Sequence, residues 1–251
     1  MGKAKDILLR PIPAAQANEL VKRVHYSGKV VQNSQIHIGV FYDGRLEGAM
    51  QFGPSLDKRK IQGLVSGTAW HEFIELNRMA FSEALPRNSE SRAIAIAMRL
   101  LKQYAPQIKW VISFADGTQC GDGTIYRASG FVLTGIRENQ TLCKLPDGRI
   151  VSGITFKKGE HILKNKGKAA VPSGTTYLPG FQLRYIYFIN PAARSRLTVP
   201  VLPFSEIQRR GAGMYKGQPI QRGESIDNDA SGLQPEEGGV NPTSPLHSSD
   251  S

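Results

Sequence analysis

Three consecutive stretches decide the fold: IELNRMAF (residues 74–81), PRNSESRAIAIAMRLLKQY (86–104) and KWVISFADGTQCGDGTIYRASGF (109–131). The second stretch has apolar residues at helical spacing, which predicts an amphipathic helix from Ser89 to Tyr104. The near-continuous apolar run from Trp110 to Ala115 predicts a strand covered on both faces. A strand, a polar loop, a helix and a buried strand therefore follow one another. The helix start is an expected anion site, because its backbone N–H groups are unsatisfied.

The remaining pattern supplies further strands and two more helices. Asp43-Gly44 between two alternating segments is a strong hairpin signal. Expected strands are 7–12, 36–42, 46–52, 73–81, 131–135 and 183–189, and expected helices are 14–24 and 124–129. We expect 53–67 to be a polar loop. Hairpins mixed with returning helices predict a three-layer α/β domain around a mixed sheet, with an α+β arrangement as the alternative.

We expect one catalytic domain over residues 1–210, with basic insertions at about 53–67 and 157–180. Residues 211–251 are rich in Gly, Ser, Pro and acidic residues, which predicts a disordered acidic tail.

The charge of the chain is strongly uneven. The net charge is +11, but residues 217–251 carry one basic and six acidic residues, which leaves +16 on residues 1–216. A body this basic favours a polyanionic partner, most simply nucleic acid, and solubility alone is the alternative.

Cysteine content and hydropathy limit the cellular context. The two cysteines, Cys120 and Cys143, have no CxxC spacing, so we expect neither a disulfide framework nor a zinc site. No apolar run approaches the roughly 20 residues of a membrane helix. The N-terminus lacks an apolar signal core. We therefore expect a cytoplasmic protein without a membrane partner.

The loop before the main helix carries the first candidate residues, Arg87, Ser89 and Ser91. Their side chains could add donors to the helix N-terminus and hold an anionic donor group. The alternative is that a serine is simply the N-cap of the helix.

Arg78 lies within an apolar strand, where a buried guanidinium needs an anionic partner. It is a candidate clamp for a carboxylate or phosphate, and an ion pair with Glu72 or Glu75 is the alternative. Strand alternation places Asn77 on the other face.

Asp116 ends the buried strand, at the edge where α/β sheets bind ligands. It is a candidate general base or amine-orienting residue, with a turn residue as the alternative. Tyr126 precedes Gly130-Phe131 on a short predicted helix, where a tyrosine is typical of a core edge. His25 and Tyr26 follow the first predicted helix. The histidines show no ligand spacing, so no metal site is predicted.

These residues resemble the GNAT acyltransferases and, within them, the Mom family of phage DNA-modification proteins. The resemblance rests on His25-Tyr26-Ser-Gly, ELNRMAF, RNSESRAI, FADGTQ, IYRASGF and RLTVPVLPFSEI, and covers roughly residues 7–207. It departs from most GNAT enzymes at the donor loop, where Glu90 and Arg92 replace glycines.

The resemblance implies a GNAT-like three-layer α/β/α fold with a mixed, mostly antiparallel sheet. It further implies addition of an N6-methylcarbamoyl (acetamido-type) group to adenine in DNA, which protects phage DNA from restriction. The residues it assigns to the active site are His25, Tyr26, Arg78, Ser91, Asp116 and Tyr126. It also implies that the Tyr126 phenol donates a proton to the leaving group. It leaves the cofactor open between an acyl-coenzyme A-like donor and an iron requirement.

The expected substrate is double-stranded DNA. The sequence leaves open whether the chain forms a homodimer. Such an enzyme should flip the adenine into a pocket, because the amine lies inside the duplex. Candidate phosphate contacts are Lys58, Arg59, Lys157, Lys158, Lys164, Lys166 and Lys168. Two alternatives remain, an acyl-coenzyme A-dependent N-acetyltransferase on a small amine or protein, and a non-catalytic DNA-binding protein.

Overall fold

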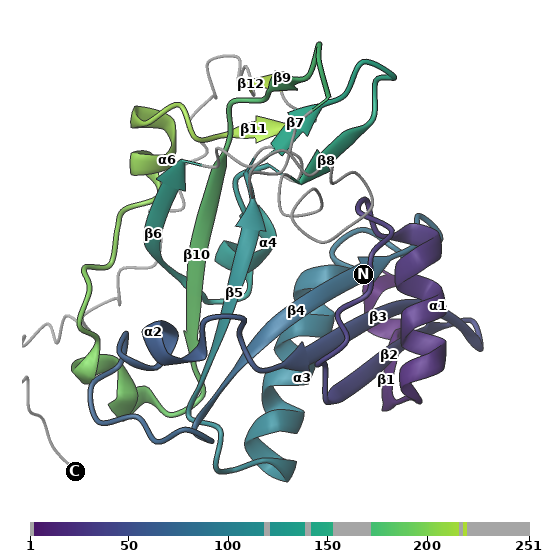
Figure 1. The fold of residues 1–251 in the computed structure, drawn as a ribbon. Coiled ribbons are helices and arrows are strands. Elements are labelled where there is room, and N and C mark those ends of the chain that lie inside the picture. The colour runs from purple at the N-terminus through teal and green to yellow at the C-terminus, as the bar shows by residue number, and fades with distance from the viewer. Residues whose placement is uncertain (1–2, 118–120, 139–141, 153–171, 216–217, 220–251) are drawn as a thin grey trace, which may run out of the picture. The chain divides into compact units, whose positions relative to one another are not determined.

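A seven-stranded mixed sheet in the order β1-β2-β3-β4-β5-β10-β6 organises the chain (Figure 1). The computed structural model describes residues 3–117, 121–138, 142–152, 172–215 and 218–219. Only β4 and β5 run parallel; the other neighbouring strands of this sheet are antiparallel. The mixed, mostly antiparallel sheet expected from the sequence is confirmed.

The strands of the main sheet are β1 (Leu8–Pro11), β2 (Ile36–Tyr42), β3 (Arg45–Gly53), β4 (Phe73–Phe81), β5 (Trp110–Asp116), β6 (Val132–Glu138) and β10 (Phe181–Phe188). The helices are α1 (Ala14–Val24), α2 (Lys58–Gln62), α3 (Ser89–Tyr104), α4 (Thr124–Ala128) and α6 (Ser205–Arg209), with 3-10 helices η1 (Lys3–Asp6) and η2 (Pro191–Arg196).

The helix α3 covers one face of the sheet. Its apolar stripe, which includes Ile94 and Met98, packs in one core cluster with Ile74 and Leu76 of β4 and Val111 of β5. Strand alternation sends the neighbouring residues to the other face. This main cluster therefore fixes α3 as the crossover between the parallel strands β4 and β5, as the helical spacing predicts.

Two separate units cover the opposite face. Ala17 and Leu20 of α1 pack on Ala49 of β3. Farther along the sheet, Leu64 and Val65 pack with a second cluster of buried side chains. That cluster contains Phe73, Trp110, Ile112, Ile186 and Ala193. The fold thus has three layers, with α3 on one side and α1 together with the α2 and η2 segments on the other.

Two sequence expectations about loops are wrong. Residues 53–67 are more than a polar loop, because 58–62 form α2 and Leu64 and Val65 are buried. The tail does not begin at 211, because β11 (Met214–Tyr215) and β12 (Gln218–Pro219) pair as a short hairpin. Residues 220–251 lie outside the described ranges.

A small second sheet separates β6 from β10 in the chain. It joins β7 (Leu142–Lys144) to β8 (Ile150–Ser152) and β9 (Thr176–Tyr177). Its cluster holds Cys143, a buried thiol whose pKa is raised by burial. The predicted insertion at 157–180 falls largely on residues 153–171, which are not described.

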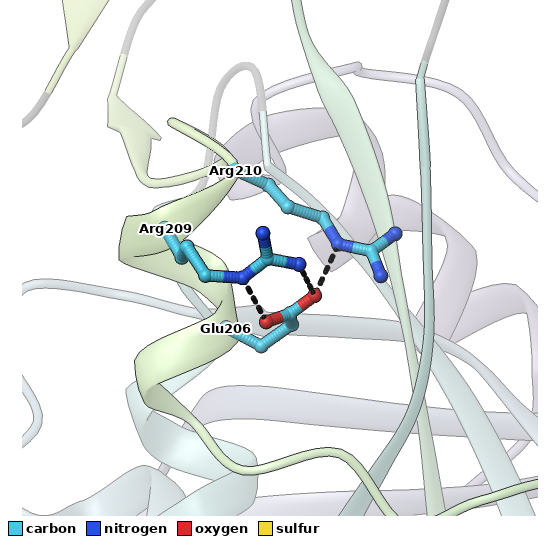
Figure 2. A network of polar contacts seen from close by, with 3 residues as sticks. All are labelled: Glu206, Arg209 and Arg210. Carbon is cyan, nitrogen blue, oxygen red and sulfur yellow. Dashed lines mark hydrogen bonds and ion pairs between the residues drawn. The ribbon is translucent and has the colours of Figure 1, made fainter.

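The short helix α6 carries a compact ion network. The carboxylate of Glu206 accepts hydrogen bonds of 2.6 Å from Arg209 Nε, Arg209 Nη2 and Arg210 Nε (Figure 2). Hydrogen bonds from Arg209 and then Arg210 lower the pKa of Glu206 to about 2. The network fixes both guanidinium groups relative to the end of α6.

None of the described helices is long and apolar enough to cross a membrane.

Candidate active site

The parallel strands β4 and β5 separate and leave an open fork in the sheet. They pair only from Phe73–Glu75 against Trp110–Ile112. Beyond Glu75, β4 continues along β3, while β5 continues along β10 to Asp116 (Figure 1). The carboxyl ends of both strands therefore diverge at the place where α/β sheets bind ligands.

A buried hydroxyl pair lies where the strands part. Ser113, the first β5 residue beyond the pairing, has its Oγ 3.1 Å from Leu76 O of β4 and 2.9 Å from Tyr126 Oη of α4. Ser113 is fully buried and Tyr126 is nearly so. We call these three residues, Leu76, Ser113 and Tyr126, the fork triad. It places the phenol predicted as a proton donor directly at the separation of the strands.

Aromatic packing fixes the Tyr126 ring. It stacks on Tyr185 of β10, with ring centroids 5.2 Å apart, and meets Phe131 edge-on at 5.3 Å. Tyr185 in turn donates a hydrogen bond of 2.5 Å to Asp122 O, just before α4. Because the ring is held on both sides, the phenol has one orientation relative to the fork.

A β-bulge at Asn77 corrects the expectation that Asn77 and Arg78 point to opposite faces. Gln51 pairs with Arg78 and Phe52 pairs with Leu76, so Asn77 is the extra residue on β4. The bulge breaks strict alternation. Leu76 faces α3, while Arg78 lies on the face of α1, since its partner Gln51 bonds Asn18 of that helix.

Arg78 is held by backbone oxygens and not by an ion pair. Its Nε donates to Lys29 O at 3.1 Å and its Nη1 to Asn77 O at 2.8 Å. Among the described residues no carboxylate forms a salt bridge with it. Glu72, one expected partner, accepts a hydrogen bond from Ala69 N instead. The guanidinium is thus held by backbone oxygens, and its charge acts through space on Glu75 and His25.

Glu75 is a further candidate site residue, which the sequence analysis treated only as an ion-pair partner of Arg78. Burial raises its pKa, against the opposing effects of the Asn77 side chain and the Arg78 charge. It is the last β4 residue paired with β5 and lies on the face of Arg78. An acidic residue within the largely apolar strand 73–81 was the available signal. Because its pKa is raised, Glu75 is a second candidate base, in addition to Asp116.

His25 and Tyr26 lie at the end of α1, on the Arg78 side of the sheet. Burial and then the charge of Arg78 lower the pKa of His25 to about 4. Ser27 N donates to His25 Nδ1 at 3.1 Å, so the neutral ring carries its proton on Nε2. The two rings lie 4.3 Å apart, and Tyr26 is half exposed. His25 is therefore neutral near pH 7 and bound to Ser27 through one nitrogen.

Acidification is expected to destabilise the protein through His25. An unfolded histidine titrates near 6.5, whereas the folded one titrates at about 4. Between those values the unfolded chain binds a proton that the folded chain excludes, so stability falls as pH drops from about 6.5 to 4, by up to about 3 kcal/mol. Urea denaturation at about pH 6.5 and at about pH 4 measures this change in the free energy of unfolding. Replacement His25→Gln should reduce the loss; equal losses in both proteins would contradict it. Glu75, with a raised pKa, acts in the opposite direction and is common to both proteins.

Gly53 lets the bulge form. A Cβ there would lie 2.6 Å from Asn33 O, 2.7 Å from Asn77 Oδ1 and 2.9 Å from Ser34 Cα. We predict that Gly53→Ala destabilises the protein by about 1–3 kcal/mol through overpacking. Gly63→Ala is the matched control, since its Cβ would come no closer than 3.7 Å to Lys60 O. Denaturant unfolding of both variants measures the difference, and equal stabilities would refute the close-packing argument.

The start of α3 follows the end of β4 after a loop of seven residues, 82–88, on the side where the two strands diverge. The expectation that a serine caps this helix is wrong: Asn88 occupies the N-cap with φ +70, and Ser89 is the first helical residue. Ser89 Oγ is buried and has no hydrogen-bond partner within the described ranges. Ser91 Oγ donates to Asn88 O, and Arg87 is exposed. A free buried hydroxyl at a helix N-terminus fits an anionic group.

Asp116 ends β5 opposite Gln182 and is half-buried. Alternation along β5 places it on the face of Arg78, whereas Ser113 and Tyr126 lie on the face of α3. The next residue is tightly packed, because a Cβ on Gly117 would lie 2.8 Å from Phe181 O and 3.1 Å from Ala212 O. Asp116 and Tyr126 thus flank the fork from opposite faces.

The other predicted contacts divide into two groups. Lys58 and Arg59 lie on α2. Lys157, Lys158, Lys164, Lys166 and Lys168 all lie outside the described residues. Within the described part of the chain, no group of three or more His, Cys, Asp or Glu side chains could hold a metal ion.

Comparison with known proteins connects this arrangement to a family. Among solved structures, the chain is similar to the IAA acetyltransferase of Bacillus cereus ATCC 14579 (12% identity, 72% of this chain, 99% of that chain, TM-score 0.44). It is also similar to the ribosomal-protein-S18-alanine N-acetyltransferase of Escherichia coli (11% identity, 73% and 94%, TM-score 0.43).

The sequence matches are closer. The chain is 36% identical over 202 residues to the methylcarbamoylase Mom of Escherichia phage Mu, which covers 77% of this chain and 80% of the phage protein. The profile of the Mom protein family matches residues 6–206, which run from the last residue of η1 through the whole main sheet to the first residues of α6. The chain belongs to the Mom protein family.

Proposed function

We propose that this chain is a DNA-modifying transferase that converts adenine in DNA to its N6-methylcarbamoyl (acetamido-type) form and so protects phage DNA from host restriction. The observation that supports this most is the 36% identity to the phage Mu methylcarbamoylase across 80% of that protein. The basic body of the chain, +16 over residues 1–216, supports a DNA substrate independently.

The fork triad suits the step of a group transfer in which the leaving group departs. Tyr126 Oη can give its proton to the leaving group, and Ser113 Oγ, 2.9 Å away, keeps the phenol aimed at the fork. A phosphate-bearing acyl donor would supply the transferred carbonyl group, with its anionic end at the start of α3. Ser89 and Arg87 are the residues that would hold that anion; Glu90 in the same turn would oppose a second negative charge.

The opposite face suits the acceptor. An adenine flipped from the duplex could stack on Tyr26, which is half exposed. The exocyclic amine must lose a proton when it forms the new bond. Asp116, at the end of β5, is the proposed base, and Glu75 is a second carboxylate on the same face. Arg78 would stabilise negative charge that develops on the transferred carbonyl.

Restriction sensitivity tests the proposal. Plasmid DNA from cells that express the protein should resist a panel of restriction enzymes whose sites contain adenine. DNA from cells that express Asp116→Ala at the same level should be cut normally. Identical digestion of both plasmids, with both proteins folded, would overturn the proposal.

A further inference from the structure

Two segments far apart in sequence form one surface beside α2. Val65 bridges to Leu197, Ser66 N donates to Arg196 O at 2.8 Å, and Thr198 N donates to Leu64 O at 2.9 Å. Arg196 Nη1 also donates to Ser66 O at 2.9 Å. These bonds fix η2 against the α2 segment. We call Lys58, Arg59, Lys60, Trp70, Arg194 and Arg196 the α2–η2 surface.

The α2–η2 surface has an excess of positive charge. It carries five basic side chains, of which Arg59, Lys60 and Arg194 are exposed. The acidic residues of the two segments, Asp57 and Glu72, are engaged locally: Asp57 pairs with Lys60 at 2.8 Å, and Glu72 accepts from Ala69 N at 2.9 Å. The remaining cations are arranged on a fixed backbone, which suits a repeating anionic chain.

An exposed tryptophan, Trp70, lies among these basic side chains. Trp70 is 51% exposed, and Lys58 Nζ lies 4.4 Å from its ring centroid. The same ammonium lies 5.3 Å from the ring of Phe73, whose side chain is buried in β4. A half-exposed aromatic ring with cations on both segments combines stacking with phosphate contact, as nucleic-acid-binding surfaces do.

The α2–η2 surface lies on the acceptor face of the sheet. Phe73 and Glu75 are two residues apart on β4, so their side chains share one face. Lys58 contacts Phe73, and Glu75 belongs to the face of Arg78 and Asp116. A duplex that lies on this surface is thus on the side of the sheet from which an adenine would enter the fork.

We infer that the α2–η2 surface binds the backbone of duplex DNA next to the candidate site, with Trp70 in contact with the nucleic acid. This inference rests on the proposed DNA substrate and specifies where the duplex lies.

The first test is binding of the purified full-length protein to a short, fluorescein-labelled duplex, measured by anisotropy over a range of salt concentrations. The double variant Arg59→Gln/Arg194→Gln should weaken binding about tenfold near 0.1 M salt and reduce the slope of log K against log salt by about 2. Arg99→Gln/Lys102→Gln removes two exposed charges from α3, on the other face, and is the matched control. Equal losses in both double variants, or no loss in the first, would overturn the inference.

The second test uses fluorescence, since the chain has two tryptophans and Trp110 is fully buried. Duplex DNA should quench the emission of the wild type and leave that of Trp70→Phe unchanged. Equal quenching of both would place the contact elsewhere.

Nucleoside analysis of the same proteins separates the two proposals. A wild type that modifies adenine, together with an Arg59→Gln/Arg194→Gln variant that binds and modifies DNA normally, refutes this surface and leaves the function standing. A wild type that binds DNA through this surface without modifying it supports the surface and refutes the function.

Discussion

Replacement of Tyr126 by phenylalanine is expected to lower the rate of DNA modification by at least about 100-fold, the usual size of a lost proton donor. The phenyl ring keeps its packing against Tyr185 and Phe131. Ser113 keeps its other partner, since its Oγ can still donate to Leu76 O. Loss of one buried hydrogen bond costs about 1 kcal/mol, so the variant should remain folded.

Tyr185→Phe is the matched control for this prediction. It also removes one hydrogen bond from a buried phenol, here to Asp122 O, and leaves the pair of Ser113 and Tyr126 intact. Modified adenine per hour, measured with equal amounts of each protein, should be nearly normal for Tyr185→Phe and at least about 100-fold lower for Tyr126→Phe. Similar rates in the two variants would show that Tyr126 has only a packing role.

Replacement Arg78→Gln should reduce modification about 100-fold if the guanidinium stabilises charge on the transferred group. The change also has a direct electrostatic readout. Because the Arg78 charge helps to lower the pKa of His25, its removal should raise that pKa from about 4. The pKa should remain below 6.5, since burial is the larger cause. NMR titration of the His25 ring measures the shift.

Arg10→Gln is a suitable control for the loss of charge. Arg10 lies on β1, with its guanidinium carbon 4.4 Å from the Phe41 ring centroid, and is not among the causes of the His25 shift. It should leave both the His25 pKa and the modification rate unchanged. An Arg78→Gln variant with normal activity and a raised His25 pKa would restrict Arg78 to an electrostatic role outside catalysis.

The regular elements around the site could be predicted from local patterns. The apolar periodicity of Ser89–Tyr104 and the runs at 73–81 and 110–115 correspond to α3, β4 and β5 with bounds that agree within one residue. The predictions of these elements are correct because each element buries one face, and the spacing of the apolar residues on that face is visible in the sequence. Asp116 and Tyr126 remain predicted site residues, and both lie near the end of the buried strand 110–115 in the sequence.

The features that the sequence did not predict depend on pairing between distant segments. The bulge at Asn77 comes from a register shift between β3 and β4, which no local spacing reveals. Helix α2 contains three consecutive basic residues and is held by burial of Leu64 and Val65 against residues near 197. Glu75 gains its raised pKa from burial at the end of the β4–β5 pairing. Each property arises only when the sheet is assembled.

The most direct test of the central claim is mass spectrometry of nucleosides from plasmid DNA of cells that express the wild type, with Asp116→Ala as the control. The account predicts a new adenosine species, heavier by an acetamido-type group, in the wild-type DNA and its absence from the control. An unmodified nucleoside profile from cells that contain soluble, folded wild-type protein and support modification by the phage Mu enzyme would contradict it.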